Sequence, residues 1–119
     1  MKLKRLYNRL FCRFDRTDFS YDEAMEIYKR TNALLIDVRT PEEYIEKHID
    51  GAINIPVYEI DNIKNEIIDK NKVILLYCKT GKRSKMVKQV LLQNGYKNVY
   101  TFSVKIWKSK SLKRPFSLI

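Results

Sequence analysis

A thiol, three cations and a glycine lie together in the segment Cys78-Lys79-Thr80-Gly81-Lys82-Arg83-Ser84. The segment follows the apolar run 73–77, which is typical of a central parallel strand buried on both faces. A helix is predicted directly after it. Inward-turned N–H groups of the loop, the helix N-terminus and the three cations would all favour a thiolate over a thiol. The same features would favour the binding of an oxyanion.

We therefore expect Cys78 to be a nucleophile rather than a buried and inert cysteine, although buried free cysteines are common. Gly81 permits loop conformations that are closed to other residues. Ser84 is expected either to cap the helix or to hydrogen-bond the sulfur. Attack by the thiolate also needs an open approach. The predicted substrate-binding loop consists of Lys79, Thr80, Gly81, Lys82, Arg83 and Ser84. Lys79 and Arg83 could hold the oxyanion of a donor, the arginine with bidentate geometry.

Three further polar residues need a decision between a chemical and a structural role. Asp37 and Arg39 follow the apolar run 34–36 and could support the site from a neighbouring strand. A structural ion pair, for example Arg39 with Glu43, is the favoured alternative, because such pairs are common and rarely catalytic. His48 is the only histidine, and we predict a structural role for it.

Short apolar strands alternate with helices along the chain, which predicts a parallel α/β sheet covered on both faces. Ser20 with Glu23, and Thr40 with Glu43, have the spacing of capping boxes that begin helices. The first of these helices is expected to end near residue 30. Further strands are expected at 34–36, 52–56, 73–77 and 99–102, and further helices at 58–68 and from the loop to about residue 94, with Met86, Val87, Val90 and Leu91 on its apolar face.

The order of these motifs resembles the rhodanese family over residues 20–100. The resemblance is carried by the segments 35–39, 41–44, 48–56, 78–84 and 94–99. It implies a three-layer α/β/α fold with a central five-stranded parallel sheet. It also implies a sulfurtransferase in which Cys78 takes a sulfane sulfur from an anionic donor such as thiosulfate and passes the persulfide sulfur to cyanide or a thiol. No cofactor is implied. The alternative is a sulfur-carrier or protein-interaction module of the same fold without catalysis.

Loop length separates two activities that share such a cysteine loop. Related phosphatases and arsenate reductases have a longer loop, in which the arginine would stand at position 84. Here Arg83 is one position earlier and Ser84 follows it. The shorter loop resembles that of the sulfurtransferases.

Charge is unevenly distributed over the 119 residues. The net charge of +10 divides into +5 for residues 1–16, −8 for residues 17–69 and +13 for residues 70–119, and no acid follows Asp69. A strongly positive net charge favours an anionic small molecule or an acidic protein as the binding partner. No recognised motif supports binding to nucleic acid. The two cysteines and one histidine are too few for a disulfide framework or a convincing zinc site.

The two ends of the chain lie outside the resemblance. Residues 1–16 are predicted to form a basic amphipathic arm, and its Cys12 is expected to be an ordinary apolar-face residue rather than a resolving thiol. Residues 17–119 form the predicted domain, with a basic C-terminal tail whose path over 103–119 departs from the family. Val104 and Lys105 stand where a Gly-Gly turn is usual, Ile106 is kept, and Ser109 replaces the expected Trp, with Trp107 two positions early. No transmembrane segment is expected, and we predict a cytoplasmic monomer.

Overall fold

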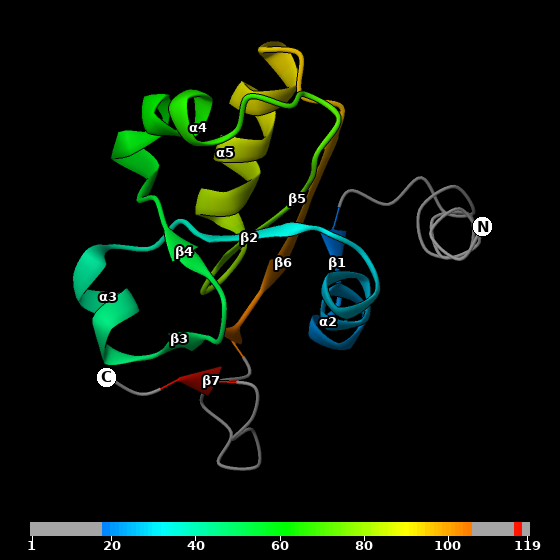
Figure 1. Ribbon diagram of the computed structural model, residues 1–119. Helices are drawn as coiled ribbons and strands as arrows, with labels where there is room; N and C mark the ends of the chain where they lie inside the picture. The colour runs from blue at the N-terminus through cyan, green and yellow to red at the C-terminus, as the bar shows by residue number, and fades with distance from the viewer. Residues whose placement is uncertain (1–17, 106–115, 118–119) are drawn as a thin grey trace.

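A five-stranded sheet with the strand order β1-β6-β5-β2-β4 forms the centre of the molecule (Figure 1). All four strand pairings are parallel. The computed structural model describes residues 18–105 and 116–117. The strands of this sheet are β1 (Asp18–Phe19), β2 (Leu34–Asp37), β4 (Ile53–Asn54), β5 (Val73–Cys78) and β6 (Asn98–Ser103). The predicted five-stranded parallel sheet is confirmed.

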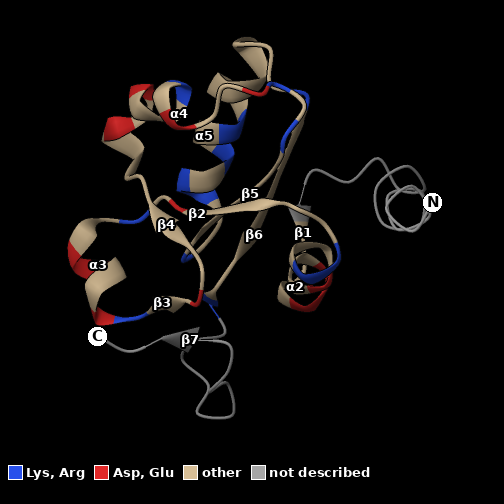
Figure 2. Cartoon of the chain, in the orientation of Figure 1, with Lys and Arg blue, Asp and Glu red and all other residues tan. Residues whose placement is uncertain are grey.

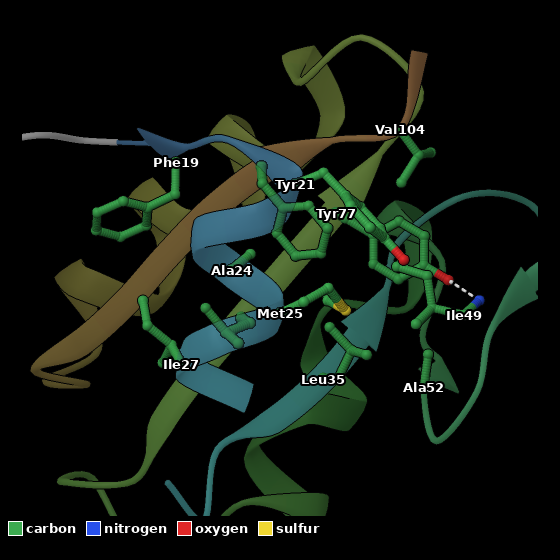
Figure 3. Packing of buried hydrophobic residues seen from close by; sticks show 12 residues of the cluster. Phe19, Tyr21, Ala24, Met25, Ile27, Leu35, Ile49, Ala52, Tyr77 and Val104 are labelled. Atoms are coloured by element: carbon green, nitrogen blue, oxygen red, sulfur yellow. Dashed lines mark hydrogen bonds between the residues drawn. The ribbon is translucent and has the colours of Figure 1, made fainter. Parts of the chain in front are cut away.

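Helices cover both faces of this sheet. Alternate residues of a strand point to opposite faces, and on β5 both sets of side chains are apolar and buried under helices. Leu75 and Tyr77 of β5 belong to the core beneath α2 (Tyr21–Arg30) (Figure 3). Ile74, Leu76 and Cys78 belong to the core beneath α4 (Asp61–Glu66) and α5 (Lys82–Gln93). Both faces of β5 are therefore buried, which explains its continuous apolar sequence. The predicted three-layer α/β/α arrangement is confirmed.

Local capping signals fix where two helices begin. Ser20 Oγ accepts a hydrogen bond from the Glu23 N–H, and Glu23 Oε1 accepts one from the Ser20 N–H. Thr40 and Glu43 make the same reciprocal pair at the start of α3 (Pro41–Glu46). Each pair satisfies N–H groups that a helix start leaves without intrahelical partners. Both predicted helix starts are confirmed.

The helix expected at 58–68 is shorter and divided. A 3-10 turn, η2 (Val57–Glu59), precedes α4, which ends at Glu66. Ile67 then adopts an extended backbone, which buries Ile67 and leaves Ile68 with 84% of its surface exposed. The apolar face predicted for α5 is also wrong at one position, since Met86 is 59% exposed while Val87 and Leu91 are buried.

The strand expected at 52–56 is confirmed as the two-residue β4, but three other very short strands were not predicted from the sequence. Besides β1, these are β3 (His48–Ile49) and β7 (Phe116–Ser117), which pair in antiparallel fashion. At the end of β6, Val104 is fully buried and donates its N–H to the Cys78 carbonyl (3.0 Å). A valine in place of a glycine thus adds core packing beside the strand that carries the cysteine.

Some predictions concern residues outside the described ranges. These are the basic arm 1–16 with Cys12, and Ile106, Trp107 and Ser109 of the tail. Within the described residues, no helix has the length and apolar character needed to cross a bilayer.

Candidate functional site

Cys78 is the last residue of β5, and its sulfur receives hydrogen bonds from the loop that follows. The Gly81 N–H donates to Sγ at 3.0 Å, and the Ser84 N–H donates to Sγ at 3.4 Å. The Cys78 thiol also lies 3.6 Å from Ser84 Oγ, to which it can donate. Two backbone N–H groups therefore converge on one sulfur at the N-terminal end of α5, an arrangement that suits a sulfur anion.

Gly81 makes this loop geometry possible. It is the residue before α5 and has a left-handed backbone with φ of 95°. A Cβ added there would meet no atom within 4 Å, so the backbone conformation and not lack of space favours glycine. Ser84 does not cap the helix: its hydroxyl donates to the Gly81 carbonyl (3.1 Å) and faces the sulfur. Of the two roles predicted for Ser84, the structure shows the contact with sulfur.

The cysteine is buried, which differs from the open approach expected for a nucleophile. Cys78 has no solvent exposure, whereas Lys79, Thr80 and Lys82 of the same loop are exposed. The loop therefore points the N–H groups of Gly81 and Ser84 at the sulfur and exposes both of its lysines. Cys78 is buried because the loop whose N–H groups bind the sulfur also covers it.

Arg83 faces a carboxylate of this chain. Its Nη1 donates to Glu43 Oε1 (2.7 Å) and its Nη2 donates to Oε2 (3.2 Å). Both side chains are about one third exposed, at 35% and 32%. The hydrogen bonds from Arg83 lower the pKa of Glu43 to about 2, and the same contact raises the pKa of Arg83. The bidentate edge predicted to hold a donor is therefore occupied by Glu43.

The structure also corrects the predicted partner of Arg39. Arg39 pairs with Asp37 through Nε (3.0 Å to Oδ1) and Nη2 (2.7 Å to Oδ2), not with Glu43. Asp37 has no exposure and Arg39 is 5% exposed. Arg39 Nη2 also donates to the Lys47 carbonyl, and the Asn54 amide donates to the carbonyls of Asp37 and Arg39. The pair therefore ties the end of β2 to α3 and β4.

Two aromatic contacts complete the support beneath the site. The Ile49 N–H donates to the Tyr77 hydroxyl (3.1 Å), which joins β3 to β5 (Figure 3). Burial raises the pKa of Tyr77, so this hydroxyl stays protonated. The His48 ring stacks on Tyr44 with 3.8 Å between ring centroids, and its Nδ1 lies 2.8 Å from the Tyr44 carbonyl. Tyr77 and Cys78 belong to different cores on opposite faces of β5, and the His48 contact joins β3 to α3, so we interpret both interactions as structural supports.

Glu43 is the site residue that the sequence reasoning did not assign. Its spacing from Thr40 indicated a capping box, but nothing local indicated Arg83 as its partner, 40 positions along the chain. Within the described residues, no group of three or more His, Cys, Asp or Glu is arranged to hold a metal ion.

The chain is an α/β domain with a parallel sheet, and its cysteine lies between the central strand and the helix that follows it. The family model of the rhodanese-like domain matches residues 20–108, and the chain belongs to this family.

Individual relatives agree with the family match. The thiosulfate sulfurtransferase PspE of Escherichia coli is 43% identical over 65 residues, which cover 54% of this chain and 62% of PspE, less than two thirds of its length. The thiosulfate sulfurtransferase GlpE of Coxiella burnetii is 34% identical over 92 residues, covering 76% of this chain and 85% of GlpE. A solved structure of a rhodanese with anions from E. coli matches with a TM-score of 0.61 and 33% identity, covering 73% of this chain and 99% of that one.

Proposed function

We propose that the protein is a rhodanese-type sulfurtransferase that moves a sulfane sulfur from thiosulfate, or a similar small anion, to a thiol or cyanide. The observation that carries the proposal is the pair of N–H groups from Gly81 and Ser84 that point at Cys78 Sγ. Donors fixed in this way stabilise negative charge on sulfur without reorganisation during the reaction. Two relatives named thiosulfate sulfurtransferase support the choice of donor.

In the first step, the Cys78 thiolate attacks the outer sulfur of thiosulfate. A bond forms between Sγ and that sulfur, the sulfur–sulfur bond of thiosulfate breaks, and its electron pair leaves with sulfite. Negative charge passes to the terminal sulfur of the persulfide. The N–H groups that held the thiolate are close enough to stabilise the persulfide as well.

In the second step, an acceptor thiolate or cyanide attacks the terminal sulfur of the persulfide. The new bond forms to the acceptor, the bond to Sγ breaks, and its electron pair returns to Cys78 as thiolate. Charge and atoms balance without a further reductant, and no cofactor takes part.

The donor's oxyanion is held at the exposed side of the loop. Lys79 is exposed next to the cysteine and supplies a mobile point charge. Arg83 uses one N–H of each Nη for Glu43, and within residues 18–105 no acceptor is found for the rest of its guanidinium. Because Cys78 has no exposure, the donor reaches Sγ only when the loop moves aside.

A thiosulfate:cyanide assay tests the proposal with matched cysteine variants. We expect Cys78→Ser to lose activity, because its hydroxyl is a far weaker nucleophile than a thiolate. Cys12→Ser removes the other thiol and is expected to keep activity, since cyanide needs no resolving cysteine. Equal activity of the wild type and Cys78→Ser would show that the mechanism is wrong.

The burial of Cys78 also supports a second candidate, a non-catalytic sulfur-carrier or interaction module. Such a protein would receive sulfur from a dedicated partner and would be slow with free thiosulfate. Intact-mass measurement after incubation with thiosulfate distinguishes the candidates: one added sulfur atom, lost on reduction and absent in Cys78→Ser, supports the enzyme. The cytoplasmic location and the monomeric state stay predictions.

A further inference from the structure

The exposed side of α5 extends the positive charge of the cysteine loop along the helix. Lys82, Lys85 and Met86 are exposed and lie on one side of the helix by their spacing, and Lys79 precedes them in the loop. We call these four residues the α5 strip. No acidic residue occurs in α5 or anywhere after Asp69 (Figure 2). The strip therefore begins at the candidate nucleophile and has a single sign of charge.

Neighbouring elements have the opposite charge and limit the extent of the strip. Glu42 and Glu46 are exposed on α3 and Glu59 is exposed on η2. Asp61 and Glu66 are exposed on α4, where Lys64 leaves a net charge of −1. Figure 2 shows red on α3, both red and blue on α4, and blue on α5. An acidic ligand is attracted to α5 and repelled by the helices beside it, so the charge pattern fixes where such a ligand can lie.

Exposed apolar side chains accompany the lysines. Met86 is 59% exposed in the strip, and Tyr58 is 69% exposed on η2, which packs against α5. Methionine and tyrosine are enriched in protein interfaces, where they supply adaptable apolar contact. A single-stranded nucleic acid would instead need a row of aromatic platforms, and Tyr58 is the sole exposed aromatic side chain among those described.

We propose that the α5 strip is the docking surface for an acidic polypeptide that carries the acceptor thiol. The sulfur step rests on the proposed function: the polypeptide's thiolate attacks the terminal sulfur of the Cys78 persulfide, takes that sulfur, and leaves Cys78 as thiolate. Docking on the strip brings the incoming thiol to the loop that covers Cys78. The lysines of the strip thus select the acceptor by charge, whereas Cys78 and the N–H groups that bind its sulfur perform the chemistry.

Two peptides test this selectivity with the full-length protein. One peptide has a cysteine flanked by glutamates, and the other is identical except that lysines replace the glutamates. After Cys78 has been charged with thiosulfate, single-turnover discharge is followed by intact mass. We expect the glutamate peptide to react about fivefold faster or more at low salt, and the preference to shrink in high salt.

Charge reversal on the strip should change this preference. Lys85→Glu is expected to reduce the ratio of the two rates by about three- to tenfold, and Lys85→Gln by less, because charges at an interface rim act mainly on association. Lys29→Glu, an equal change at an exposed position of α2 on the other side of the sheet, is the matched control and should leave the ratio unchanged. Equal rates for the two peptides, or equal effects of Lys85→Glu and Lys29→Glu, would overturn the proposal.

Binding to the uncharged protein separates this proposal from the proposed function. Fluorescence anisotropy with serine versions of both peptides requires no sulfur transfer. A preference for the glutamate peptide that Lys85→Glu removes supports docking even if Cys78 never accepts sulfur. If a generic single-stranded RNA binds more tightly than the glutamate peptide and loses affinity in Lys85→Glu, the strip is a nucleic-acid surface and the proposal is wrong.

Discussion

Two arginine–carboxylate pairs lie near the carboxyl ends of β2 and β5, and they differ in nearly every physical respect. The Asp37–Arg39 pair joins residues two positions apart and is almost completely buried. The Glu43–Arg83 pair joins residues 40 positions apart and is about one third exposed at both ends. Both have short, charge-assisted hydrogen bonds, so the chemistry of the contact alone does not distinguish them.

Their surroundings give the two pairs different roles. Arg39 also donates to the Lys47 carbonyl, and the Asn54 amide donates to the backbone carbonyls of Asp37 and Arg39, so the buried pair and its surroundings support the fold. Arg83 lies in the loop that holds the sulfur, and water reaches the contact with Glu43. A buried charge that loses its partner is costly, whereas a partly exposed arginine can exchange one anion for another. We therefore interpret the first pair as a brace and the second as an adjustable part of the site.

Breaking the brace should have the largest effect. Arg39→Met removes the cationic partner of the buried Asp37 carboxylate, and of the hydrogen bonds that residue 39 donates to this carboxylate it leaves only the one from the backbone N–H. We expect the free energy of unfolding to fall by about 3–5 kcal/mol in urea denaturation. Arg39→Lys keeps the charge and should be destabilised less, which provides a folded comparison if Arg39→Met does not fold.

The matched control is Arg30→Met, which breaks the exposed pair of Arg30 with Glu26 on α2 (3.3 Å). Its expected cost is about 0–1 kcal/mol. The distinction between brace and adjustable pair fails if Arg39→Met costs no more than Arg30→Met.

A smaller effect, on activity rather than folding, is expected for Arg83→Lys. The lysine keeps the charge but loses the planar fork that can hold Glu43 and an oxyanion together. We expect KM for thiosulfate to rise about tenfold, the equivalent of about one charge-assisted hydrogen bond, with a smaller change in kcat. Steady-state kinetics with thiosulfate measures the change, and an unaltered KM would exclude Arg83 from donor binding.

The smallest effect is expected for Glu43→Gln, and it depends on pH. Folding lowers the pKa of Glu43 from 4.5 to about 2, so the charged pair stabilises the fold fully above about pH 4.5. That stabilisation, about 0–1 kcal/mol for an exposed pair, should disappear as the pH falls towards 2. Urea denaturation of the wild type and the variant across this range gives the difference.

Arg83→Met provides the background for a control, because the hydrogen bonds from Arg83 are the largest cause of the lowered pKa. In that background, Glu43→Gln should show much less pH dependence. A wild-type advantage that stays constant or grows on acidification would contradict the interpretation.

The sequence predicted those features that depend on neighbours in the chain. The helix starts at Ser20 and Thr40 follow from contacts over three residues, and the buried strand β5 follows from an unbroken apolar run. The divided helix at 57–66 shows the limit of such patterns, because the periodicity of Ile60, Ile63 and Ile67 did not reveal the extended backbone at Ile67.

Features that depend on distant contacts could not be predicted. β1 consists of two residues, and its pairing with β6 has no signal in its own sequence. The partner of Arg83, which is 40 positions away, was unpredictable for the same reason. The partner of Arg39 is a local residue, Asp37, but the sequence did not decide between it and Glu43. The cysteine loop was predicted because strand, glycine and cations are contiguous, but the burial of Cys78 depends on packing from other elements.

The complete burial of Cys78 has a consequence for its survival under oxidative conditions. Oxidation of a cysteine beyond the sulfenic acid is irreversible in most proteins, and it requires access of peroxide to the sulfur. A sulfur held at 3.0 Å by the Gly81 N–H beneath its own loop is shielded whenever the loop is closed. If the protein acts as proposed, the loop movement that admits a sulfur donor also exposes the sulfur to peroxide, and turnover then increases the risk of oxidative damage.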